Sequence, residues 1–188
     1  GGLLRASLVL LAGGALALLL PLLAGPWLTR LYTPDEFGRF HLFAAVAANL
    51  AVAFSQMGER TLLVDANLRR PVQHQLFELP SRMGLSNMLL GRAGPECIAK
   101  VPHFFDLSIL TAGSTAPNPQ ELLARDGFAA LLRSAEEAHD IVIVDSPAAA
   151  GSADAQIVAA RTGLGVLVAR RGRTDANVLR RVHGMLGD

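Results

Sequence analysis

The clearest indication of the fold comes from two stretches of sequence, Thr-Leu-Leu-Val-Asp at residues 61–65 and Ile-Val-Ile-Val-Asp at residues 141–145. Both are short apolar runs of the kind that a sheet covered by helices on both faces requires. The alternation of such runs with helical stretches predicts βαβ units and a mainly parallel sheet. The other expected strands are residues 107–110 and 165–169, and the expected helices are residues 85–90, 120–138, 153–161 and 175–186.

Both apolar runs end in an aspartate, Asp65 in the first and Asp145 in the second. Ligands of an open α/β sheet bind beyond the carboxyl ends of its strands, so we expect both carboxylates at the same crevice. A carboxylate there can hold Mg²⁺ or accept a proton from an attacking group, and an ordinary helix-cap or turn role is the alternative. Asn67 and Arg69 follow the first run and add polar groups to the same edge.

The composition excludes several classes of function. The 188 residues carry a net charge of +1, which gives no argument for nucleic-acid binding. The single cysteine, Cys97, excludes an internal disulfide. The five histidines are scattered, and no two have the helical spacing of a metal-binding pair.

The sequence has one lysine, Lys100, among 17 cationic side chains. The common phosphate-binding loop, G-x-x-x-x-G-K-[ST], needs a lysine directly after a glycine. Lys100 follows an alanine instead. The 188 residues therefore contain no ordinary phosphate-binding loop.

Residues 6–29 contain no charged side chain and form a run of 24 residues. This exceeds the roughly 20 residues that cross a hydrocarbon core. Arg5 and Arg30 flank the run, and Trp27 and Tyr32 lie at its far end, where interfacial aromatic residues are common. The pattern predicts a transmembrane helix, with a buried core helix or a signal peptide as alternatives.

A second apolar helix is expected through residues 40–54, ending near Gly58. It contains His41 and Asn49, which makes a second membrane span marginal. The segment 29–38, Thr-Arg-Leu-Tyr-Thr-Pro-Asp-Glu-Phe-Gly, lies between the two apolar runs. Together, residues 5–50 resemble the N-terminus of polysaccharide flippases, but such exporters have many more spans than this chain has.

The remainder of the chain, about residues 48–186, resembles the bacterial tyrosine kinases of the chain-length-determinant type. Residues 58–71 resemble the second Walker-type motif of these kinases, and residues 140–147 resemble their Walker B strand. Residues 84–91 and 110–123 resemble two further loops of the family. The resemblance implies a P-loop-NTPase-like α/β domain with a mainly parallel sheet and flanking helices. The domain is expected to be incomplete and to follow the N-terminal transmembrane helix.

The resemblance implies roles for four residues. Asp65 and Asp145 match acidic positions that handle Mg²⁺, so both are candidate catalytic and metal-binding residues. Arg69 matches the arginine of the second motif, and Asn67 stands where a second aspartate is usual. Both are candidate cofactor contacts, with ATP and Mg²⁺ as the implied cofactors. The first Walker motif, expected just before residues 48–51, is replaced by the flippase-like segment.

Three functions are therefore open. The first is a tyrosine-kinase-like component of exopolysaccharide chain-length control, weak or inactive by itself. The second is a membrane-tethered, non-catalytic interaction module, and the third is a fused or truncated product of neighbouring flippase and kinase genes.

We expect two domains: a membrane helix with an interfacial loop at residues 1–39, and an incomplete kinase-like domain at residues 40–188. The expected location is the bacterial inner membrane, with the α/β domain on the cytoplasmic side. The expected partners are the membrane, a polysaccharide chain-length or polymerisation protein and further copies of the chain, with no nucleic acid.

Overall fold

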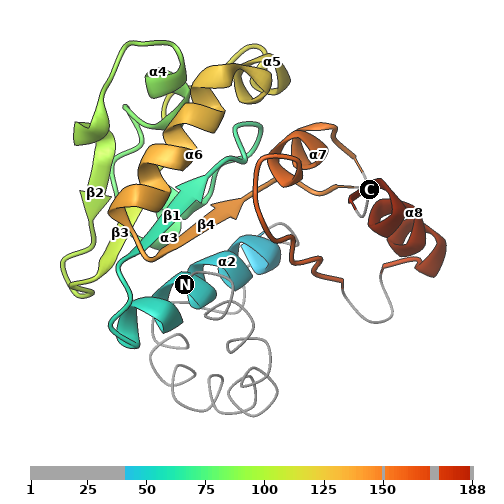
Figure 1. Cartoon of the computed structure of the whole chain (residues 1–188), viewed down its shortest axis with the longest axis horizontal. Coiled ribbons are helices and arrows are strands. Elements are labelled where there is room, and N and C mark those ends of the chain that lie inside the picture. Colours follow the sequence, from blue (N-terminus) through green and yellow to red (C-terminus); the bar gives the residue numbers. More distant parts are fainter. Residues whose placement is uncertain (1–40, 150, 170–173, 187–188) are drawn as a thin grey trace. The chain divides into compact units, whose positions relative to one another are not determined.

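A computed structural model describes residues 41–149, 151–169 and 174–186 of the chain (Figure 1). The chain divides into two units, Gly1–Leu42 and Phe43–Asp188, and the site described below lies in the second. The predicted membrane helix, the flippase-like segment and the predicted domain boundary at residue 39 fall outside the described residues. Among the described helices, none has both the length and the apolar character needed to cross a membrane.

One four-stranded sheet, in the order β2-β3-β1-β4, forms the centre of the second unit. Its strands are β1 (Thr61–Asp65), β2 (Ile98–Lys100), β3 (Leu107–Leu110) and β4 (Ile141–Asp145). β1, β3 and β4 are parallel, as the sequence predicts, whereas β2 was not expected and adds an antiparallel edge.

The described part of the chain also contains seven α-helices. They are α2 (His41–Gln56), α3 (Gln73–Leu76), α4 (Leu85–Leu89), α5 (Pro119–Ala124), α6 (Asp126–Ala138), α7 (Asp154–Ala159) and α8 (Ala176–Leu186), with a 3-10 turn η1 (Pro95–Cys97). α2 is confirmed close to its expected bounds, and Gly58 follows it with a positive φ of 86°. The single helix expected at 120–138 is wrong, because Arg125 has an extended backbone (ψ 151°) that separates α5 from α6.

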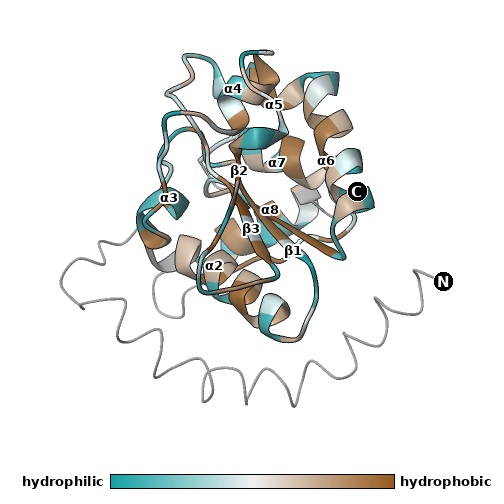
Figure 2. Ribbon diagram, turned by 90° about the vertical axis from the view of Figure 1, so that its left-hand side faces the viewer, coloured by the Kyte–Doolittle hydropathy of each residue, from teal (hydrophilic) through white to brown (hydrophobic). Residues whose placement is uncertain are grey.

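The sheet has a hydrophobic core on each face, because successive side chains of a strand point to opposite sides. Leu62 and Val64 of β1 pack in one core with the apolar side chains of α4, α5, α6 and α7. Leu63 packs in the other core with Ala51 and Val52 of α2. Figure 2 shows α2 on one side of the sheet and α4 to α7 on the other. The apolar strands are thus covered on both faces, as expected.

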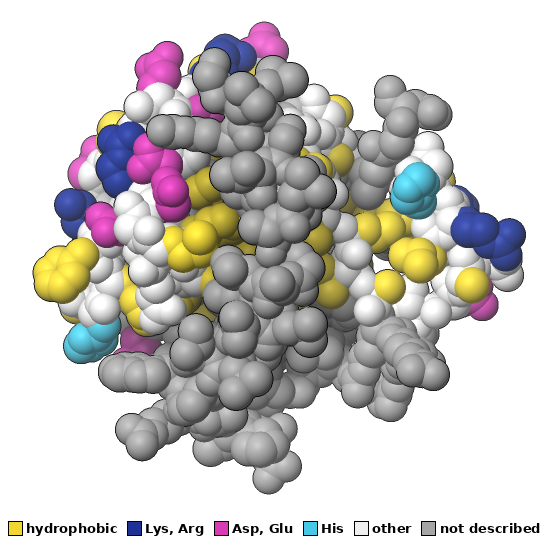
Figure 3. All heavy atoms as spheres, turned by 60° about the horizontal axis from the view of Figure 1, so that its bottom comes forward, with side chains coloured by type: hydrophobic (Ala, Val, Ile, Leu, Met, Phe, Trp, Pro, Cys, Tyr) yellow, Lys and Arg dark blue, Asp and Glu magenta, His cyan; other side chains and the backbone are white. Residues whose placement is uncertain are grey.

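The strand expected at residues 165–169 is wrong: these residues are irregular and exposed. Leu164 and Val166 are each 70% exposed. β4 is therefore an edge strand, and residues 141–144 are only half-buried, whereas every residue of β1 is buried. An apolar run indicates strand propensity, but it does not specify the neighbour that would pair with it. Figure 3 shows that hydrophobic side chains also reach the molecular surface on the face seen there.

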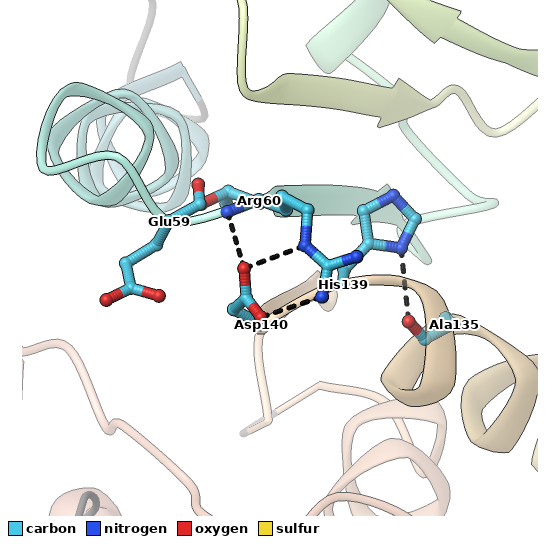
Figure 4. A network of polar contacts seen from close by, with 6 residues as sticks. Glu59, Arg60, Ala135, His139 and Asp140 are labelled. Carbon is cyan, nitrogen blue, oxygen red and sulfur yellow. Dashed lines mark hydrogen bonds and ion pairs between the residues drawn. The ribbon is translucent and has the colours of Figure 1, made fainter.

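The N-terminal ends of β1 and β4 are joined by Arg60 and Asp140 (Figure 4). The Arg60 Nε donates to Asp140 Oδ2 at 2.9 Å, and Nη2 donates to Oδ1 at 2.8 Å. The backbone N–H of Arg60 donates to the same carboxylate at 3.0 Å. These contacts align the two strands at one end, so that residues in register meet at the other end.

Candidate functional site

Asp65 and Asp145 lie side by side at the carboxyl ends of β1 and β4, where they are partners in the parallel register. Asp65 is fully buried and Asp145 is 9% exposed. The structure thus brings together the two aspartates that the sequence singled out. Two carboxylates in a buried position are costly unless protons, hydrogen bonds or a cation compensate for their charge.

The protonation of Asp65 is perturbed by its surroundings. Burial and the neighbouring charge of Asp145 raise the pKa of Asp65 to about 7, although backbone N–H groups of Gln73 and Asn67 act in the opposite direction. These N–H groups donate to Asp65 Oδ2 and Oδ1, each at 3.2 Å. Burial also raises the pKa of Asp145, against a hydrogen bond from Gln73. We call Asp65 and Asp145 the acid pair. Near neutral pH this pair can therefore gain or lose a proton.

Gln73 is the site residue that sequence reasoning missed. Its side chain is fully buried, and Nε2 donates to Asp145 Oδ2 at 2.7 Å and to the carbonyl oxygen of Ala44 in α2 at 3.0 Å. Its Oε1 is buried and has no partner within the described part of the chain. The sequence offers one signal: Gln73 lies between two apolar residues, Val72 and Leu76, at the spacing of one helical turn.

Asn67 stays beside the acid pair, whereas Arg69 pairs with a residue that the sequence analysis did not single out. The Asn67 Oδ1 accepts from the backbone N–H of Arg70 at 3.2 Å. The Arg69 Nε donates to Asp154 Oδ2 at 2.7 Å, and Nη2 donates to Oδ1 at 3.1 Å. The Asp154 side chain is fully buried and the Arg69 side chain is 47% exposed. Arg69 therefore ties the loop after β1 to α7.

Arg69 also borders a surface cavity of about 420 Å³. Asn118, Pro119 and Glu121, from the N-terminal turn of α5, form part of its wall. Asn118 is the N-cap residue of α5, and Pro119 is its first residue. Arg69 thus lies at the boundary between its ion pair with Asp154 and an open surface cavity.

The acid pair fits a divalent cation better than it fits a nucleotide. The two carboxylates supply oxygen ligands, which Mg²⁺ prefers. Phosphates need cationic partners, and the described residues place no unpaired lysine or arginine of the expected motifs beside the acid pair. Lys100 lies on β2, two strands from β1, and Arg69 is already ion-paired with Asp154.

The mainly parallel sheet, covered on both faces and carrying acidic residues at neighbouring strand ends, defines a P-loop-NTPase-like α/β domain. Over 141 residues the chain is 33% identical to the putative tyrosine-protein kinase CapB of Staphylococcus aureus, a match that covers 75% of the chain and 62% of CapB. The chain belongs to this family, the bacterial tyrosine-protein kinases. It is also 39% identical over 132 residues to the tyrosine-protein kinase YwqD of Bacillus subtilis, covering 70% of the chain and 56% of YwqD.

Solved kinase domains support the same assignment. The VpsO kinase domain superimposes with a TM-score of 0.71 at 34% identity, over 75% of this chain and 70% of that one. The kinase domain of Escherichia coli ETK gives a TM-score of 0.73 at 34% identity, over 76% of this chain and 56% of that one. No family model matches the chain. The chain spans less than two thirds of CapB and of YwqD.

Proposed function

We propose that the chain is a tyrosine-kinase-like component of exopolysaccharide chain-length control, with little or no ATP-dependent activity by itself. The observation that carries the proposal is the acid pair, in register at the carboxyl ends of two parallel strands. Membership of the tyrosine-kinase family supports the catalytic class. We place the protein at the bacterial inner membrane, with the α/β domain on the cytoplasmic side.

In this proposal Asp65 and Asp145 hold Mg²⁺, and Asp65 also accepts a proton. A bound Mg²⁺ supplies charge neutralisation for phosphoryl transfer. The pKa of about 7 belongs to the site without a cation, where Asp65 can take up a proton near neutral pH. A bound Mg²⁺ would lower this pKa, so cation binding is expected to release a proton from Asp65. Asn67 is neutral, whereas the second aspartate usual at this position would be charged. The site therefore has one negative charge fewer to attract a cation. Arg69 is the proposed cofactor contact, through the exposed part of its side chain.

We expect weak activity because the site lacks the lysine that binds the phosphates of ATP in P-loop enzymes. Positioning and electrostatic stabilisation supply nearly all of the catalysis in phosphoryl transfer, and the loop lysine is central to both in P-loop enzymes. The 188 residues contain no glycine-lysine pair of that kind, and Lys100 is on the opposite edge of the sheet from β4. The acids therefore remain without the loop lysine that would hold the phosphates.

Calorimetric titration with Mg²⁺ tests the acid pair directly. The wild-type chain is expected to bind Mg²⁺ without nucleotide, and Asp145→Asn is expected to weaken that binding at least about tenfold, because a carboxylate ligand is lost. Asp106→Asn is the matched control, since Asp106 precedes β3 at the other end of the sheet. Equal Mg²⁺ affinity of the wild type and Asp145→Asn would contradict the proposal.

A second candidate function is a non-catalytic interaction module that binds a polysaccharide chain-length or polymerisation protein. The exposed apolar residues at 164–168 favour it, because a contiguous apolar segment is a common contact surface. The test is co-purification with such a partner in the absence of nucleotide. Complex formation that survives Val166→Asp would contradict the involvement of this segment.

A further inference from the structure

We propose that Gln73 is a positioning residue that holds Asp145 ready for a divalent cation and connects it to helix α2. The inference rests on the proposed cation site of the acid pair and adds a residue to it. Gln73 is fully buried, and it contacts both aspartates and α2. No other described residue has hydrogen bonds to all three.

The orientation of the Gln73 amide is determined by its partners. Asp145 Oδ2 and the carbonyl oxygen of Ala44 are both acceptors, at 2.7 and 3.0 Å. Only the NH₂ group of the amide can donate to them, and the reversed amide would place Oε1 against two oxygens. The nitrogen therefore faces Asp145 and α2.

In this orientation the two carboxylate oxygens of Asp145 have different roles. Oδ2 is held by the amide, whereas Oδ1 has no hydrogen-bond partner among the described residues. Carboxylates that bind metals are commonly fixed by a hydrogen bond to one side, and loss of such a bond costs 10 to 100-fold in affinity. Oδ1 is thus the oxygen left for a cation or for its bound water.

Gln73 also links the acid pair to the neighbouring elements. Its backbone N–H donates to Asp65 Oδ2 at 3.2 Å, while its side chain reaches the first turn of α2 through Ala44. Both contacts originate at the first residue of α3. A shift of α2 would therefore change the position of the amide and, through it, that of the Asp145 carboxylate.

A purely structural role for Gln73 predicts a different result from a positioning role. In both cases, replacing the amide with an apolar side chain of similar size leaves buried acceptors without a donor and lowers stability. Only the positioning role predicts that the remaining folded protein binds the cation more weakly. Cation affinity, measured apart from stability, separates the two roles.

The experiment is a calorimetric titration with Mn²⁺, used as the probe, on the full chain. Gln73→Met keeps the volume and removes both donors, and Gln75→Met is the matched control because Gln75 is exposed on the same short helix. We expect Gln73→Met to weaken Mn²⁺ binding about tenfold, and Gln75→Met to leave it unchanged. Wild-type affinity in folded Gln73→Met would overturn the inference, whereas no binding by the wild type would overturn the cation site itself.

A second measurement serves if Gln73→Met does not fold. In wild-type chain labelled with ¹⁵N-glutamine, we expect one side-chain amide protected from hydrogen exchange, because Gln73 is the fully buried glutamine among those described. Its resonance is expected to shift when Mg²⁺ is added. No protected amide, or a protected amide that saturating Mg²⁺ leaves unshifted, would overturn the inference.

Discussion

At the scale of single residues, burial is the main cause of the raised pKa of Asp65. It lies at the end of a strand whose residues are all buried, and its carboxylate faces that of Asp145 across the register. The raised pKa is the consequence, so the folded protein holds a proton that the unfolded chain releases. This makes stability depend on pH in a direction that can be measured.

Stability is expected to fall as the pH rises from about 4 to about 7. Between the ordinary pKa of an aspartate and the folded value of about 7, the folded state binds more protons than the unfolded state, so raising the pH favours unfolding. The loss is roughly 3 to 5 kcal/mol, at about 1.4 kcal/mol per pKa unit. Urea unfolding of the wild type at several pH values, beside Asp65→Asn, measures it. Parallel pH profiles for the two proteins would contradict the expectation.

Gly113→Ala is expected to destabilise the protein by about 2 kcal/mol or more, because Gly113 has a φ of 81° and a Cβ there would lie 2.7 Å from the backbone N of Gly84. The same Cβ would also meet Asn87 Oδ1 and, at 2.9 Å, Ser86 Oγ. Gly151→Ala is the control, since nothing lies within 4 Å of its Cβ position. Equal urea midpoints for the two variants would show that the crowded position tolerates a side chain.

At the scale of elements, Arg69 and Asp154 join the loop after β1 to α7. Asp154 is fully buried, so its charge needs the partner that Arg69 supplies. We expect Arg69→Met to lower the urea midpoint clearly more than Arg82→Met, a matched change at an exposed arginine. If Asp154→Asn, combined with Arg69→Met, restores part of the loss, the buried charge is the cause. A loss that the second substitution leaves unchanged would argue against that explanation.

Most elements could be predicted from the sequence, and the exceptions have physical reasons. The apolar runs that end at Asp65 and Asp145 predicted β1, β4 and their neighbouring acids, because periodicity and strand ends are local signals. The break at Arg125 depends on one backbone angle, and the irregular segment 165–169 depends on pairing that a local pattern does not encode. Gln73 was missed because its partners are 29 and 72 residues away in the chain.

At the scale of the whole molecule, the sequence and the structure agree on a kinase-like sheet with its acid pair in place. Membership of the tyrosine-kinase family agrees with this architecture. The chain spans part of the length of its relatives, so the activity of a whole relative does not transfer directly. In our proposal, these 188 residues keep the acid pair that would bind a cation but lack the lysine that would bind the phosphates.

Calorimetric titration of the full chain with ATP in the presence of Mg²⁺ tests this claim most directly. We expect no binding with a micromolar dissociation constant, because Lys100, the single lysine, lies on β2 at the opposite edge of the sheet from β4. The same preparation should bind Mg²⁺ alone, which shows that the site is intact. Micromolar binding of ATP, at about one nucleotide per chain, would contradict the proposal that the phosphates have no binding group.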